Sequence, residues 1–107
     1  MRVLKFIVDD QTIRQDPSCN FSGLVPGTEG YLQAQFSFSK EWNNTTKVVG
    51  FYSKLGKEYT PQLLKNGITC IIPAEATKNR TFKVRVLGKS KDLTLRTNKL
   101  AIEQEGG

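Results

Sequence analysis

The stretch Tyr31-Leu-Gln-Ala-Gln-Phe-Ser-Phe-Ser-Lys-Glu-Trp42 alternates apolar and polar side chains as far as Phe38. Such a period of two is typical of a β-strand that buries one face, whereas an amphipathic helix repeats its apolar residues at spacings of three and four. The same alternation returns at Phe82–Val86 and, more briefly, at Leu93–Arg96. The pattern therefore predicts an all-β protein whose strands turn one face to a core and one to water.

Short strands recur along the whole chain, separated by turn-forming residues. Asn66-Gly67 is a strong hairpin signal because this pair populates the turn that matches the twist of paired strands, and residues 73–76 are expected to form one helical turn. About seven to nine such strands are typical of a two-sheet antiparallel sandwich, with a small β-barrel as the alternative. The expected strands are residues 2–8, 12–14, 31–38, 46–54, 58–64, 68–72, 81–87, 93–97 and 99–103.

The size of the chain fits one domain. Its 107 residues are enough for a single core, and we expect the domain to span residues 1–103 and residues 104–107 to form a flexible tail. No stretch approaches the ~20 apolar residues of a membrane span, so no membrane partner is expected. Lys5 interrupts the apolar run at the start of the chain, which we interpret as a first strand and not as a secretory signal. This interpretation predicts synthesis in the cytoplasm without export, and hence reduced, largely buried thiols at Cys19 and Cys70.

Residue types that support catalysis or metal binding are sparse. The chain has no histidine, which removes the commonest general base and the usual metal ligand. Asp9 and Asp10 are adjacent, but neighbours on a strand point to opposite faces. We therefore predict a non-enzymatic protein without metal or cofactor. A paired-carboxylate glycosidase that uses Glu41, Glu58 or Glu75 is the enzymatic alternative.

Basic charge is concentrated in the last third of the chain. The net charge is +6 overall, whereas residues 78–99 alone carry +7. Lys83 and Arg85 alternate with apolar residues, as Arg96 does in the next strand, so pairing of these strands would place all three on one outer face. The residues expected at the ends of this face are Lys78, Arg80, Lys89 and Lys91. We interpret the face as a solvated surface with edge-blocking lysines, as a contact for an acidic protein, or as a nucleic-acid site.

Three aromatic residues are candidates for a second kind of contact. Tyr31, Trp42 and Tyr52 could stack on sugar rings, which would make the chain a module that binds cell-wall carbohydrate. The alternative for Trp42, which follows a strand containing two phenylalanines, is a structural one. In that interpretation its ring closes the end of the core.

A string of landmarks covers roughly residues 30–98 of the chain. The landmarks are Gly30-Tyr31, Phe36-Ser-Phe-Ser-x-x-Trp42, Lys47, Phe51, Leu64, Asn66-Gly67, Cys70, Ile72-Pro-Ala-Glu75, Phe82-x-Val-x-Val86, Gly88 and Thr97-Asn98. Together they resemble a small Ig-like β-sandwich domain of tailed-bacteriophage virion proteins. Such proteins include baseplate, tail-fibre and decoration proteins of siphovirus-like phages and of prophages in Gram-positive hosts.

The resemblance implies a structural module for attachment in the tail, baseplate or fibre, or for decoration of the capsid. Its expected partners are other virion proteins and a second copy of the chain, with nucleic acid as a less favoured alternative. The expected location is the virion, after synthesis in the cytoplasm of the host bacterium. The resemblance rests on core and turn residues, and it carries over no defined binding residues.

Overall fold

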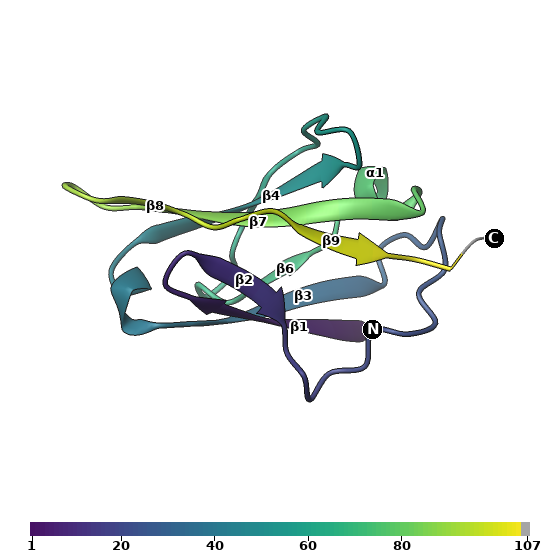
Figure 1. Cartoon of the computed structure of the whole chain (residues 1–107), viewed down its shortest axis with the longest axis horizontal. Helices are drawn as coiled ribbons and strands as arrows, with labels where there is room; N and C mark the ends of the chain where they lie inside the picture. Colours follow the sequence, from purple (N-terminus) through teal and green to yellow (C-terminus); the bar gives the residue numbers. More distant parts are fainter. Residues whose placement is uncertain (106–107) are drawn as a thin grey trace.

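The computed structural model describes residues 1–105, which fold into two β-sheets packed face to face (Figure 1). The first sheet has the strand order β2-β1-β3-β6, and the second has the order β5-β4-β7, with β8 and β9 both paired to β7. The all-β sandwich expected from the sequence is confirmed. The strands are β1 (Arg2–Asp9), β2 (Thr12–Gln15), β3 (Leu32–Phe38), β4 (Thr46–Ser53), β5 (Gln62–Leu63), β6 (Thr69–Ile71), β7 (Thr81–Lys89), β8 (Thr94–Arg96) and β9 (Leu100–Glu103), and the short helices are η1 (Lys40–Trp42) and α1 (Ala74–Thr77).

One strand pair departs from the antiparallel arrangement that we expected. β1 runs parallel to β3, with Arg2 opposite Leu32 and Val8 opposite Phe38. The other pairs between the strands of residues 1–105 are antiparallel. Parallel neighbours need a long connection between them, which β2 and the loop after it supply. The first sheet is therefore mixed.

Side chains from the inner faces of both sheets form one hydrophobic core. The period of two is realised in β3, where Leu32, Ala34 and Phe36 are buried and the glutamines between them, Gln33 and Gln35, are more exposed. The ring of Phe36 stacks on that of Phe6 at 5.2 Å between centroids, and a row of rings continues through Phe38 to Trp42. Aromatic pairs at such separations contribute about 0.5–1.5 kcal/mol each beyond the area they bury. The predicted strand pattern thus produces an aromatic spine along the sandwich.

The two sheets are tied together at both of their edges. Asn66 and Gly67 have φ values of 54° and 73°, as the predicted turn requires, but the strands that flank it do not pair as the expected hairpin. The turn instead carries the chain from β5 in one sheet to β6 in the other. At the other edge, the Oδ1 atom of Asn98 accepts a hydrogen bond from the backbone N–H of Ile13 at 2.9 Å. The backbone N–H of Asn98 donates to the carbonyl of Gln11 at 3.2 Å. Asn98 therefore joins the β8–β9 connection to β2 across the open side of the sandwich.

The packed domain extends beyond the predicted boundary at residue 103. Gln104 is 3% exposed, and its Nε2 atom donates to the carbonyl oxygens of Thr77 and Asn79, each at 2.7 Å. The backbone N–H of Glu105 donates to the carbonyl of Leu24 at 2.7 Å. Buried carbonyls at the end of α1 need donors, and Gln104 supplies them. The prediction of a tail from residue 104 is therefore wrong for residues 104–105, and residues 106–107 lie outside the described part.

The two thiols lie in different environments. Cys19 and Cys70 are both free, and burial raises the pKa of the Cys70 thiol to about 12, so this side chain stays protonated. Cys19 is half-buried, and the prediction of burial is confirmed for Cys70 alone. Among the helices of residues 1–105, none has the length and apolar character needed to cross a membrane.

Candidate protein-interaction face

The outer side of the second sheet carries the basic residues that alternate along β7. Lys83 lies opposite Tyr52 of β4, and Leu87 lies between Val48 of β4 and Arg96 of β8. Residues directly opposite each other in an antiparallel pair point to the same side of the sheet. We call this surface the basic face, and its residues are Val48, Gly50, Tyr52, Lys83, Arg85, Leu87, Lys89, Arg96 and Lys99. The register thus brings Lys83, Arg85 and Arg96 onto one outer face, as their alternation predicted.

Of the four residues expected at the ends of the face, some lie on or next to it and others lie away from it. Lys89 ends β7 opposite Thr94, and Lys91 is exposed in the β7–β8 turn, which projects beyond the rest of the sandwich in Figure 1. Lys78 and Arg80 lie at the opposite end, before β7 begins, and Arg80 lines a separate hollow beside Leu55. The structure therefore joins Lys89 to the face and leaves Lys78 and Arg80 apart from it.

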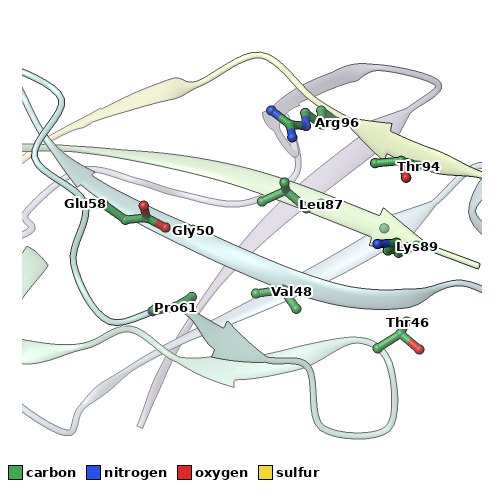
Figure 2. A pocket seen from close by; sticks show the side chains of 10 residues that line it. Thr46, Val48, Gly50, Glu58, Pro61, Leu87, Lys89, Thr94 and Arg96 are labelled. Atoms are coloured by element: carbon green, nitrogen blue, oxygen red, sulfur yellow. The ribbon is translucent and has the colours of Figure 1, made fainter.

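A hollow of about 610 Å³ lies in the basic face (Figure 2). Val48 and Leu87 occupy its middle and Pro61 stands at its flank, whereas Arg96, Lys89 and Glu58 stand around its margin in the same view. The complete lining is Thr46, Val48, Gly50, Glu58, Pro61, Leu87, Gly88, Lys89, Thr94 and Arg96. The hollow therefore combines an aliphatic floor with a charged rim.

Tyr52 positions two basic side chains beside the hollow, those of Lys99 and Arg85. Its ring is only 6% exposed and lies across Gly50, where there is no side chain to displace it. The Lys99 Nζ atom lies 4.2 Å from the centroid of the ring, and the Arg85 guanidinium carbon lies 6.0 Å from it. The Nε atom of Arg85 also donates to the carbonyl of Thr97 at 3.0 Å. Cation–π contacts and this hydrogen bond fix the two cations before any partner arrives.

The position of β7 tests whether its basic side chains block an edge of the sheet. β7 is flanked by β4 on one side and by β8 and β9 on the other, so Lys83 and Arg85 lie on an inner strand of the sheet. Lysines that block a sheet edge must lie on the edge strand itself. The edge-blocking interpretation therefore fails for Lys83 and Arg85.

The three candidate aromatic contacts do not form a common surface. Trp42 is completely buried, because η1 folds it over the end of the core and its Nε1 atom donates to the carbonyl of Asp10 at 2.7 Å. Tyr52 is buried in the second sheet, whereas Tyr31 is 49% exposed and precedes β3 in the first sheet. Trp42 and Tyr52 therefore offer no ring to a sugar, and the structural alternative for Trp42 is the one that the geometry supports.

The structure brings together one carboxyl pair that the sequence did not indicate. Asp10 and Glu41 meet where the β1–β2 turn contacts η1. The hydrogen bond with Glu41, followed by its negative charge, raises the pKa of Asp10 above its usual range. Glu41 has a lowered pKa, caused first by a hydrogen bond from its own backbone and then by the Asp10 side chain. These residues are far apart in sequence, Asp10 in the β1–β2 turn and Glu41 in η1, so no local sequence pattern indicates the pair.

The other carboxylates proposed for a glycosidase lie elsewhere. A hydrogen bond with the Thr60 side chain, followed by one from the Thr60 backbone N–H at 3.2 Å, lowers the pKa of Glu75. Glu58 stands at the rim of the hollow. Among the described residues 1–105, no three Cys, Asp or Glu side chains gather in a group that could hold a metal ion. The Asp10–Glu41 pair is on the surface and does not line the hollow.

Comparison of the chain with protein-family models, with curated proteins and with solved structures gave no match. The function is therefore inferred from the basic face and from the landmark resemblance.

Proposed function

We propose that the chain is a non-enzymatic structural module of a tailed-phage virion, which docks onto another virion protein through the basic face. The observation that supports this proposal is that the positive charges of the basic face, on the second sheet, form no ion pair with a carboxylate of the described residues. Within residues 1–105 the one ion pair joins Arg14 to Asp9 at 3.9 Å, in the first sheet. The cations of the basic face thus have no carboxylate partner among the described residues. A surface of this kind is complementary to an acidic protein.

The landmark residues support the framework of the proposed module and not its contact surface. Trp42 and Val86 are buried, Asn66 and Gly67 make the turn between sheets, and Asn98 ties the sheets together. Such residues maintain a sandwich and can be shared by proteins with different partners. The contacts that are particular to this chain are therefore assigned to the outward side chains of β4, β7 and β8.

The experiment for this proposal uses phage particles. Particles purified from a lysogen that carries the gene should contain the chain, as detected by mass spectrometry. A charge-reversed variant with Lys83→Glu, Lys89→Glu and Arg96→Glu should fold but be absent from the particles. Particles without the wild-type chain contradict the virion role. Particles that retain the charge-reversed variant contradict the use of the basic face.

A matched control separates loss of docking from the change in net charge. Lys5, Lys65 and Lys78 are exposed and lie outside the basic face. Their simultaneous replacement by Glu changes the net charge equally, and this control variant should still enter the particles. Genes for capsid and tail proteins on either side of this gene would independently support the proposal.

Nucleic-acid binding is a second candidate, favoured by the same unneutralised charge. Binding to duplex DNA would weaken with salt, with a slope of about −0.9 in log–log form for each phosphate contacted. Arg96→Gln would then reduce the magnitude of this slope by about one unit. Fluorescence anisotropy with a labelled duplex measures both effects. Absence of binding at about 50 mM salt, where electrostatic binding is strong, eliminates this candidate.

A further inference from the structure

We infer that the hollow in the basic face binds a short acidic segment of a partner protein, with an apolar side chain of that segment seated against Val48 and Leu87. The inference deepens the proposed function, on which it rests, by naming the chemistry of the contact. It depends on three observations: the aliphatic floor, the arrangement of charge around it, and the lack of an aromatic ring among the described residues that line the hollow.

The floor of the hollow suits an apolar side chain. Val48 and Leu87 are directly opposite each other on β4 and β7, and both are only half-buried, so their outer surfaces contact water in the free protein. Gly50 contributes no side chain, and Pro61 stands at the flank (Figure 2). The hollow is within the range of roughly 300–1,000 Å³ typical of ligand pockets, so it has room for more than one residue. Covering this floor removes apolar surface from water, which favours binding.

The rim of the hollow is positively charged at one end and negatively charged at the other. Arg96 of β8 lies beside Leu87 of β7. Lys89 follows Leu87 by two residues in β7, at the end of the hollow where Thr46 and Thr94 add hydroxyl groups. Glu58 stands at the other end in Figure 2. Acidic residues of the segment should therefore lie beside Arg96 and Lys89, and the end beside Glu58 should be neutral or basic. This polarity sets the orientation of the segment.

The same features favour a protein segment over a nucleic acid. Single strands bind by stacking bases on accessible rings, whereas the ring of Tyr52 is buried and already covered by Lys99. The floor offers aliphatic groups to the ligand, and Glu58 would repel a phosphate that reached the far end. A peptide that is acidic at one end, apolar in the middle and neutral or basic at the other end matches every part of the lining.

The test is a titration followed by the amide signals of the ¹⁵N-labelled protein. Three probes are compared: a blocked peptide of sequence Asp-Glu-Leu-Gly-Ser, which is acidic at one end and neutral at the other, the same peptide with Ser in place of Leu, and an oligothymidylate of equal charge. The Leu peptide should shift the amide signals of Val48, Leu87 and Thr94. Because the Ser peptide loses the apolar contact, it should bind about tenfold more weakly.

Protein variants test the floor and the rim separately. Leu87→Ser should weaken binding of the Leu peptide about tenfold, whereas Leu55→Ser, at a side chain that is 97% exposed outside the hollow, should leave it unchanged. Arg96→Gln should weaken binding and reduce its salt dependence, and Lys78→Gln is its control. Arg96 is exposed, so the rim variant remains informative if Leu87→Ser does not fold.

Each outcome of the titration decides the inference. Shifts at the hollow that depend on the central Leu and on Arg96 support it. Equal binding of the Leu and Ser peptides, or shifts that avoid the hollow, overturn it, as does tighter binding of the oligothymidylate. If the chain is present in particles while the peptides do not bind, the inference that the hollow binds an acidic segment is wrong and the proposed virion role stands. If the peptides bind while particles lack the chain, the chemistry of the hollow stands and the virion role falls.

Discussion

The phenol ring of Tyr52 lies across Gly50, so close that a Cβ atom at position 50 would be 2.5 Å from the Tyr52 hydroxyl oxygen and 2.9 Å from the ring. Side chains two apart on a strand normally stand side by side above the sheet. Here the glycine lets one of them lie flat. The flat ring supports Lys99 and leaves the space beside it open, so this relationship shapes the basic face.

We expect Gly50→Ala to destabilise the protein by about 1–3 kcal/mol, because the new methyl group displaces the ring of Tyr52 from its buried position. Urea unfolding measures the change. In a Tyr52→Ala background the same substitution should be neutral or stabilising, since alanine is favoured over glycine within a strand by roughly 0.5–1 kcal/mol. An equal cost in both backgrounds would show that the ring is not the obstacle.

Trp42 is the single tryptophan of the chain and is completely buried. Its fluorescence should therefore be blue-shifted and resistant to quenching by acrylamide, and it should shift to the red on unfolding. Trp42→Phe should cost about 1–3 kcal/mol, because it leaves the Asp10 carbonyl without its donor and reduces the volume of the core. Red-shifted emission that acrylamide readily quenches in the folded protein would refute the burial of this residue.

Asn98 should stabilise the pairing of the two sheets through its side chain. Asn98→Ala removes the acceptor for the backbone N–H of Ile13, and we expect a loss of about 1–3 kcal/mol in the free energy of unfolding. Asn98→Asp keeps an oxygen at the same position and should cost less. Amide exchange at Ile13 should accelerate in the alanine variant alone. Equal effects of the two variants would contradict this role.

The Asp10–Glu41 pair predicts a specific pH dependence. Because the pKa of Asp10 is raised, the folded protein holds this proton more tightly than the unfolded chain does, and stability declines as pH rises from about 3.8 through the raised value. The lowered pKa of Glu41 acts in the opposite sense, since its contribution is present above about 4.5 and is lost as pH falls through the lowered value. Asp10→Asn abolishes the first effect and keeps a donor for Glu41.

We therefore expect Asp10→Asn to raise Tm relative to the wild type near pH 7, and this gain to shrink near pH 3, where the raised pKa leaves the Asp10 carboxyl of the wild type protonated. The φ of 53° at Asp10 is one that asparagine tolerates, so the backbone is not strained. Asp92→Asn, in the β7–β8 turn, is the matched control. A gain that is the same at both pH values would exclude coupling between Asp10 and Glu41.

The free chain is expected to be a monomer at tens of micromolar at low salt. A twofold-symmetric dimer through the basic face would place Lys83, Arg85 and Arg96 of one copy against the same residues of the other, and such repulsion is costly. Light scattering coupled to size-exclusion chromatography measures the mass. A stable dimer at low salt would show that copies associate through another surface.

Local patterns predicted much of the fold because strand and turn preferences act over a few residues. The alternation in Leu32–Phe38 identified β3, and the Asn66-Gly67 pair identified the turn between β5 and β6. The placement of Lys83 and Phe82 on opposite faces followed from the geometry of β7 alone. The predicted boundary at residue 103 failed because the burial of Gln104 depends on carbonyls presented by α1. The residues next to Gln104 in the sequence do not indicate this contact, because its partners are more than 20 residues away.

The amino-acid sequence by itself determined which faces of the strands are apolar, where the chain turns, and that Lys83, Arg85 and Arg96 point outward. Only the tertiary structure decided that β1 runs parallel to β3, that β7 is an inner strand, and that Tyr52 lies over Gly50 beside the hollow. The first set follows from the alternation of side chains along one strand. The second depends on which distant segments pair when both apolar faces are buried together, and this is a property of the whole chain.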